Sequence, residues 1–173
     1  MILWIVGLSG AGKSTVGRAL VDAMRRESDQ PVVYLDGDEL RDVWGDSLGH
    51  TVEARNQNAH RISHLCHLLD KNGVTTVATV LSIFPEWLEW NRDNLSAYFE
   101  VFLDVPMEVL EARDTKGLYA AFARGDTENV VGKDIPFPRP SNPDLTIDND
   151  PDNSDPAAIV GKILGALAAR RPE

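Results

Sequence analysis

The chain has 173 residues, of which 43% are hydrophobic and 25% are charged, and these proportions exclude a disordered chain, a coiled coil and a collagen-like repeat. Seventeen lysines and arginines against 27 aspartates and glutamates give a net charge of −10, which excludes a general nucleic-acid-binding surface but allows a local basic pocket. No apolar run approaches the roughly 18 residues of a membrane span, and the single cysteine, Cys66, excludes an intrachain disulfide. We therefore expect one domain over residues 1–173, working in the cytoplasm without a membrane or nucleic-acid partner.

Short apolar runs predict the strands. Residues 2–6 form an unbroken apolar run that ends at Gly7, which is typical of a strand buried on both faces of a parallel sheet. Similar runs predict strands over residues 31–35, 74–81, 99–103 and 145–147. Helical spacing of apolar residues predicts helices over residues 16–24, about 51–71, from Pro85, about 106–113 and about 157–170. The alternation predicts an α/β fold with a central five-stranded parallel sheet and helices on both faces.

The alternation fails between about residues 114 and 143, where Pro136, Pro138, Pro140 and Pro143 lie among residues of mixed charge. A long irregular segment in a compact domain more often closes over or binds a ligand than fills space. We therefore expect a lid here, and residues 114–143 are called the lid segment below.

Residues 7–14 match the phosphate-loop pattern G-x-x-x-x-G-K-[ST], between a predicted strand and a predicted helix. Glycines let consecutive backbone N–H groups surround a phosphate, and the next helix points its positive end at the same anion. Lys13 is then expected to reach the β- and γ-phosphates, and the Ser14 hydroxyl to ligate Mg²⁺. The alternative is a glycine-rich turn that binds nothing. The residues expected to bind ATP in this loop are Gly7, Ser9, Gly10, Ala11, Gly12, Lys13, Ser14 and Thr15.

Two carboxylates favour a small-molecule kinase over other phosphate-loop proteins. The sequence lacks the Asn-Lys-x-Asp motif of GTPases, and the third strand ends without an aspartate. Asp36 and Asp38 instead follow the second strand, at the edge of the sheet where the phosphate loop is expected. Carboxylates there can orient an acceptor hydroxyl, take its proton or hold the metal through water. The alternative is a polar turn in which Asp38 caps the next helix.

The motifs resemble those of the adenylylsulfate (APS) kinase family over about residues 2–148. The most specific is the lid sequence Arg113-Asp114-x-Lys116-Gly117-Leu118-Tyr119, which accompanies Leu35-Asp36-Gly37-Asp38-x-Leu-Arg41 and the phosphate loop. The resemblance implies a P-loop kinase fold with a lid, and transfer of the ATP γ-phosphate to the 3′-hydroxyl of a nucleotide acceptor. Family members are often dimers, so it also allows a homodimer.

Roles follow from the resemblance by position. Asp38 would be the acceptor-side catalytic carboxylate, with Asp36 and Lys13 at the metal and phosphate end. Arg113 would lie against the ATP base, and Lys116 would close over the phosphates. The residues that the resemblance assigns to acceptor binding are Asp38, Arg41, His50, Arg55, Asn58, Ser82, Lys116, Leu118 and Val130.

The acceptor side departs from the family pattern. APS kinases usually have a phenylalanine at the position of His50 and a second one in the segment that matches residues 129–132, and these rings stack on the acceptor adenine. Residues 81–87 also differ, and the sequence is similar to the cytidine diphosphoramidate kinases of bacterial capsule pathways. A smaller pyrimidine would tolerate His50 and Val130, so cytidine diphosphoramidate is the expected acceptor. The alternatives are APS, a regulatory ATP-binding module with little turnover, and an ATPase switch on a protein partner.

Three histidines, His60, His64 and His67, share one side of the predicted helix over 51–71. Zinc binding is conceivable, but no fourth ligand is evident, which favours a helix flank beside the acceptor site. Cys66 falls on the apolar stripe of the same helix and is expected in the core. Trp87 and Trp90 could lie in the core or form a wall of the acceptor pocket.

Overall fold

The computed structural model describes residues 1–45, 49–114, 116–149 and 155–170. Its centre is a sheet of five parallel strands in the order β2-β3-β1-β4-β5. The central strand pairs with a neighbour on each side, so that Trp4 lies opposite Ala78 and Glu100. The strands are β1 (Ile2–Val6), β2 (Val32–Asp36), β3 (Thr75–Val80), β4 (Tyr98–Asp104) and β5 (Leu145–Asp148).

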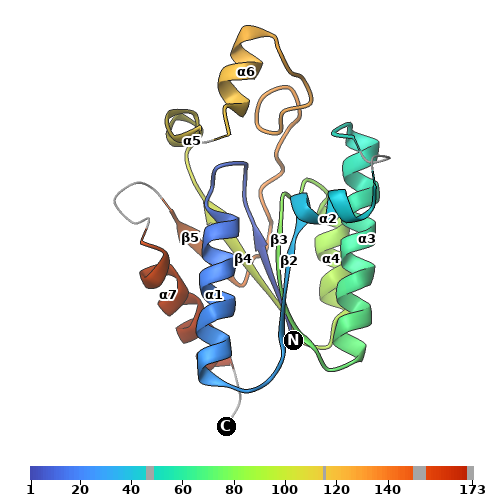
Figure 1. Ribbon diagram of the computed structural model, residues 1–173, viewed down its shortest axis with the longest axis vertical. Helices are drawn as coiled ribbons and strands as arrows, with labels where there is room; N and C mark the ends of the chain where they lie inside the picture. The colour runs from blue at the N-terminus through green and yellow to red at the C-terminus, as the bar shows by residue number, and fades with distance from the viewer. Residues whose placement is uncertain (46–48, 115, 150–154, 171–173) are drawn as a thin grey trace.

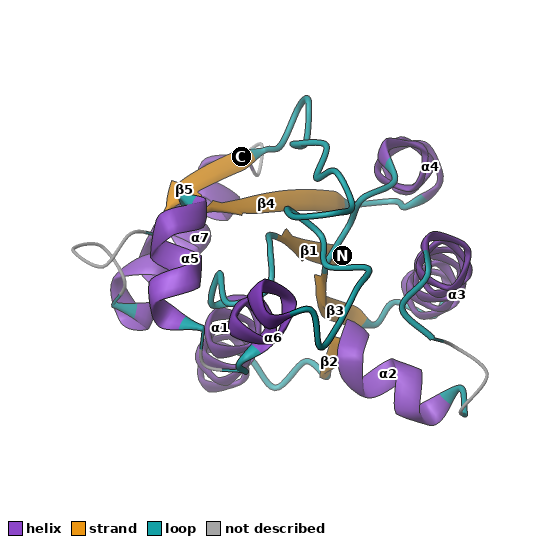
Figure 2. Ribbon diagram, turned by 90° about the horizontal axis from the view of Figure 1, so that it is seen from above, coloured by secondary structure: helices purple, strands orange, loops and turns teal. Residues whose placement is uncertain are grey.

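Helices cover both faces of the sheet (Figures 1 and 2). α1 (Lys13–Glu27) and α7 (Pro156–Arg170) lie on one face, and α3 (Val52–Lys71) and α4 (Pro85–Asn94) lie on the other. Alternate side chains of β1 enter the two cores: Leu3 and Ile5 pack toward α1 and α7, and Trp4 packs toward α3. The α/β fold expected from the sequence is therefore confirmed, with no strand limit shifted by more than one residue. No described helix is long and apolar enough to cross a membrane.

Three short helices lie above the carboxyl ends of the strands: α2 (Gly37–Val43), α5 (Met107–Arg113) and α6 (Leu118–Arg124) (Figure 1). Because all strands run in the same direction, the loops that follow β1, β2 and β3 meet at this edge. The phosphate loop, the two aspartates and the lid segment therefore surround one space.

The structure corrects two details of the sequence analysis. The carboxylate that caps α2 belongs to Asp36, which accepts the N–H of Asp38 at 3.0 Å, so Asp38 is inside the helix and its side chain stays free for the site. The lid segment is not wholly irregular, because it contains α6. This helix starts after Gly117, which has a left-handed φ of 67°, and the Asp114 carboxylate accepts the N–H groups of Tyr119 and Ala120.

Candidate active site

The phosphate loop has the backbone geometry that its glycines predict. Gly10 and Gly12 adopt left-handed φ values of 79° and 89°, and a Cβ on Gly12 would lie 2.9 Å from the Asn149 amide nitrogen. The Lys13 ammonium donates to the Leu8 carbonyl at 2.8 Å, across the loop. Burial lowers the pKa of Lys13 to about 8, although the charges of Asp38 and Asp36 oppose this shift. A bound anion beside Lys13 would therefore stabilise the charged form of this lysine.

Asp36 is the most strongly hydrogen-bonded carboxylate of the site. It accepts the Ser14 hydroxyl at 2.7 Å and the Tyr34 hydroxyl at 2.9 Å, in addition to the N–H of Asp38. Burial raises its pKa, but these hydrogen bonds outweigh burial and the net shift is downward, so the group is ionised at neutral pH. An ionised carboxylate beside the Ser14 hydroxyl is a suitable donor set for Mg²⁺, which prefers oxygen ligands and retains water.

Asp38 lies at the start of α2 and faces the lid segment. Its carboxylate accepts the Lys116 ammonium at 2.8 Å. Burial raises the pKa of Asp38, but the hydrogen bond and charge of Lys116 lower it further, so the net shift is downward. The same bond raises the pKa of Lys116. Both groups are charged at neutral pH, and they join the lid segment to the carboxyl edge of β2.

One cavity of about 1050 Å³ joins the phosphate loop to this pair. Two loop residues assigned to ATP, Gly7 and Ala11, are buried and do not line it, whereas the other residues assigned to ATP in this loop do. Within the described part of the chain, its walls contain no Phe, Tyr or Trp side chain. The expected site residues that line the cavity are Ser9, Gly10, Gly12, Lys13, Ser14, Thr15, Asp36, Asp38, Arg41, His50, Arg55, Asn58, Arg113, Lys116 and Leu118.

Two arginines supply positive charge on the acceptor side. Arg41 donates to the Gly49 carbonyl at 2.8 Å, and Arg55 donates to the carbonyls of His50 and Asn129 at 2.9 Å each. Neither forms an ion pair with a carboxylate among the described residues. Burial lowers the pKa of both groups, and for Arg55 the charge of Arg41 adds to this effect. Such half-buried guanidinium groups suit a phosphate or a similar anion.

Asn58, which was assigned to the acceptor, is engaged within the protein. Its amide nitrogen donates to the Gly37 carbonyl at 3.2 Å, and its oxygen accepts the Trp44 indole N–H at 3.1 Å. The side chain is buried and touches the cavity at one edge. Asn58 therefore fixes the turn that carries Asp36 and Asp38. Trp44 had no sequence signal for this contact, because the partner lies 14 residues away on another helix.

Val130 and Ser82 do not line the cavity. The Val130 side chain is 1% exposed and belongs to the core beneath α1 and α7, while its neighbours Asn129 and Val131 line the cavity instead. Ser82 is buried behind Leu81, and its hydroxyl has no hydrogen-bond partner among the described residues. In both cases neighbouring side chains point to different sides of the chain, and the sequence alone does not fix which of them faces the cavity.

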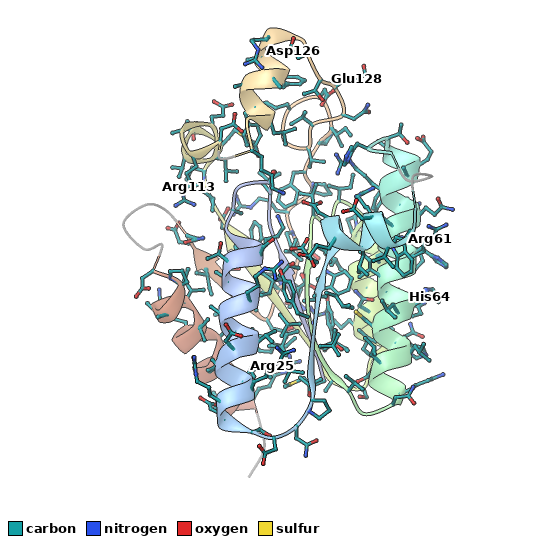
Figure 3. The ribbon with its side chains drawn as sticks, viewed as in Figure 1. Arg25, Arg61, His64, Arg113, Asp126 and Glu128 are labelled. Carbon is teal, nitrogen blue, oxygen red and sulfur yellow. The ribbon has the colours of Figure 1, made fainter. Side chains whose placement is uncertain are left out.

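The sequence analysis missed Asn149, which follows β5. Its amide nitrogen donates to the Ala11 carbonyl at 2.7 Å, and its own carbonyl accepts Arg113 at 2.9 Å. Figure 3 shows Arg113 beside α5, on the side of the molecule opposite α3. Asn149 therefore links the phosphate loop to the residue expected at the ATP base. The available signal was a polar residue at the carboxyl end of a strand.

The three histidines lie outside the cavity, and His64 lies on the outer side of α3 (Figure 3). The His64 ring stacks on Trp90 with centroids 4.6 Å apart, and the Trp87 indole donates to Asn56 at 2.6 Å. Both tryptophans are thus half-buried between α3 and α4, in neither of the two expected places. No group of three metal-binding side chains occurs among the residues the structure describes. Cys66 is buried in the core as expected.

Comparison with known proteins gives a consistent result. The family model described as adenylylsulphate kinase matches residues 1–148. The chain is 38% identical over 165 residues to an adenylyl-sulfate kinase from Gloeothece citriformis, covering 95% of this chain and 92% of that protein. It is 36% identical over 148 residues to the cytidine diphosphoramidate kinase of Campylobacter jejuni, covering 86% and 85%.

A solved structure agrees over the same length. The Mycobacterium tuberculosis APS kinase, determined in complex with AMPPNP and APS, superposes with a TM-score of 0.85 at 34% identity. The alignment covers 96% of each chain.

Proposed function

Because the chain belongs to the adenylylsulphate kinase family, and is thus an ATP- and Mg²⁺-dependent phosphotransferase acting on a hydroxyl group, we propose that its acceptor is cytidine diphosphoramidate. The γ-phosphate of ATP is transferred to the 3′-hydroxyl of this nucleotide. The observation that carries the proposal is a cavity in which an intact phosphate loop faces Arg41 and Arg55. Among the described residues neither arginine forms an ion pair, and the cavity has no Phe, Tyr or Trp wall.

The donor side holds ATP and its metal. The phosphate loop surrounds the β- and γ-phosphates, and Lys13 neutralises charge on the oxygen between them. Ser14 and Asp36, whose side-chain oxygens lie 2.7 Å apart, would hold a Mg²⁺ ion, which would neutralise charge on the phosphates. Arg113 lies against the ATP base, positioned by its bond to the Asn149 carbonyl.

The acceptor side presents the hydroxyl. Asp38 accepts a hydrogen bond from the 3′-hydroxyl and orients it toward the γ-phosphate. Lys116 moves from Asp38 to the transferring group as the lid segment closes, and Arg41 binds the capped phosphate of the acceptor. Closure also excludes water, which would otherwise receive the phosphoryl group.

The choice of acceptor depends on the base. A purine needs large aromatic faces on which to stack, and His50 is the one aromatic ring among the described cavity residues. A pyrimidine is smaller and can be held by one imidazole ring and hydrogen bonds. The 36% identity to the Campylobacter jejuni cytidine diphosphoramidate kinase is in accord with this acceptor.

APS is the second candidate. Adenylyl-sulfate kinases are among the most similar relatives at 35–39% identity, and the Mycobacterium tuberculosis enzyme was determined with APS. The two candidates share the 3′-hydroxyl, the donor site and an anionic terminal group, so they differ in the base and in the chemistry of that terminal group.

The experiment is a continuous assay of ADP formation from Mg·ATP with each acceptor separately, and ³¹P NMR of the product to locate the new phosphate. Turnover that is at least tenfold more efficient with the cytidine compound supports the proposal. Equal or greater efficiency with APS would assign the chain to sulfate activation. ADP formation independent of both would favour an ATPase switch, and no ADP formation with either would favour a regulatory ATP-binding module. Asp38→Asn, which keeps the side-chain size, serves as the inactive control.

A further inference from the structure

Asn129, in the lid segment, is the one non-glycine residue among those described whose φ, at 63°, lies in the left-handed region that favours glycine. Asparagine tolerates this conformation better than most residues, but glycine adopts it without a steric penalty. Asn129 keeps a side chain at a position where glycine would fit better, and it lines the cavity. This combination suggests that the side chain has a function.

The backbone of Asn129 is held from two sides. Its carbonyl accepts the Arg55 guanidinium at 2.9 Å, and its N–H donates to the Asp134 carboxylate at 2.7 Å. On the side of Asn129, both bonds use backbone atoms only. The side-chain amide has no hydrogen-bond partner within the described residues, so the fold does not depend on it.

The same guanidinium connects Asn129 to His50. Arg55 donates from Nε to the His50 carbonyl and from Nη2 to the Asn129 carbonyl, each at 2.9 Å. Both residues line the cavity, and the His50 ring has no hydrogen bond among the described residues. One arginine of α3 thus holds together the backbones of the two loops that carry the His50 ring and the Asn129 amide.

This pair is close to the expected place of the acceptor. Burial and the charges of Arg41 and Arg55 lower the pKa of His50, against an opposing effect from Asp38. The ring is therefore neutral at pH 7 and can stack on a base, and it is near Asp38. In the proposed complex, Asp38 binds the hydroxyl of the nucleotide and the arginines bind its phosphate. The base is then the one remaining group that the protein must bind.

We propose that Asn129 is a specificity-determining residue that reads the hydrogen-bonding edge of the acceptor's base, with its oxygen accepting the exocyclic amino group and its nitrogen donating to the adjacent ring nitrogen. This inference rests on the proposed nucleotide acceptor. An amide can form both bonds at once with cytosine, and a bidentate contact of this kind discriminates bases strongly. His50 provides the stacking face, and Arg55 is the positioning residue for both.

The test is a cycle of two changes, Asn129→Gly in the protein and removal of the exocyclic amino group from the base of whichever acceptor the wild-type enzyme uses. Glycine keeps the backbone at a φ of 63°, so thermal stability should be equal or higher and the KM for ATP unchanged. For wild type, the deaminated acceptor should lower kcat/KM by about 10–100-fold. For Asn129→Gly, the intact acceptor should show a similar loss, and the deaminated acceptor little further loss.

Equal effects of deamination on both proteins would overturn the proposal, and so would a variant that retains wild-type kcat/KM with the intact acceptor. Competition binding by isothermal titration should show the same pattern without turnover. The acceptor that the wild-type enzyme prefers tests the proposed function. The coupling between the protein substitution and the deamination tests the role of Asn129, so one of these two proposals can fail while the other stands. Asn129→Asp keeps an accepting oxygen for the amino group but places a second, negatively charged oxygen against the ring nitrogen, which is also an acceptor, so its loss should be at least as large as that of Asn129→Gly.

Discussion

The Lys116 ammonium lies 2.8 Å from the Asp38 carboxylate and joins the lid segment to the first turn of α2. The two side chains are 65% and 69% exposed, so solvent screens the pair and it adds little to the stability of the fold. Its importance is positional, because the lysine occupies an oxygen that the proposed acceptor hydroxyl requires. The proposed mechanism therefore requires Lys116 to leave Asp38 before phosphoryl transfer.

Replacement of Lys116 tests this function for the lid. We expect Lys116→Met to lower kcat by about 10²–10³-fold, since the transferring group would lose a positive charge, and to change the unfolding free energy by less than about 0.5 kcal/mol. Steady-state kinetics and a thermal melt measure the two effects. Lys116→Arg, which keeps the charge, should retain more activity. A methionine variant with wild-type kcat would show that the ion pair in the structure has no catalytic counterpart.

The lowered pKa of Lys13 predicts that the protein takes up a proton when ATP binds at alkaline pH. Its pKa is lowered from 10.5 to about 8 in the folded protein without ligand, so between these values the folded chain has lost a proton that the unfolded chain retains. Stability therefore rises with pH through this window. ATP favours the charged lysine, so binding at about pH 9 should take up a proton, whereas binding at about pH 7 should take up little.

The uptake is measured by isothermal titration in two buffers of different ionisation enthalpy at each pH. The difference in observed heat between buffers gives the number of protons. An absent uptake at the higher pH would mean that Lys13 is already charged in the free protein. Lys13→Met should abolish ATP binding and, because it removes a poorly solvated charge, leave the melting temperature of the free protein equal or higher.

The sequence was sufficient for those features that depend on local patterns. Five short apolar runs became five strands, and the phosphate loop was recognisable because glycines, a lysine and a serine recur at fixed spacing for chemical reasons. α2 and α6 were missed because seven residues are too few for a helical period to appear; α5 is equally short, but Pro106 marks its start.

Features that depend on tertiary contacts could not be predicted. Asn58 is an acceptor residue by resemblance, yet its two hydrogen bonds go to Gly37 and Trp44. The side on which Val130 points depends on the path of the lid segment, which has no regular period. Asn149 became visible only when the end of β5 was placed beside the phosphate loop.

We expect substitution of Asn149 to lower both the unfolding free energy and the affinity for ATP. Its amide bonds the Ala11 carbonyl, and it is 3% exposed, so Asn149→Ala would leave that carbonyl without its partner. We expect a loss of about 1–3 kcal/mol in unfolding free energy, together with weaker ATP binding because Arg113 depends on the same segment. Chemical denaturation and ATP titration measure these effects. The exposed Asn94, whose amide bonds a carbonyl within its own helix, offers a control at which alanine should change ATP binding little. Unchanged ATP affinity in Asn149→Ala would contradict the link between this residue and the donor site.

Two glycine-to-alanine substitutions in helices should have opposite effects on the stability of the fold. The comparison tests how α1 positions the site. A Cβ on Gly17 would lie 2.5 Å from the Thr79 methyl group and 2.8 Å from the Tyr34 ring, so α1 could not approach the sheet as closely. Close approach is what brings Ser14 within 2.7 Å of Asp36, and the Tyr34 hydroxyl also bonds that carboxylate. Gly17→Ala should therefore cost about 1–3 kcal/mol of stability and lower kcat as well.

Gly161 in α7 is the matched control, because a Cβ there meets nothing within 4 Å. Alanine at this position should stabilise the helix by about 0.5–1 kcal/mol and leave kcat unchanged. Melting temperatures should then move in opposite directions, by about 2–4 °C for each 1 kcal/mol. If Gly17→Ala lost stability but kept full activity at a temperature where it remains folded, the spacing between α1 and the sheet would serve packing alone, and the Ser14–Asp36 bond would not require it.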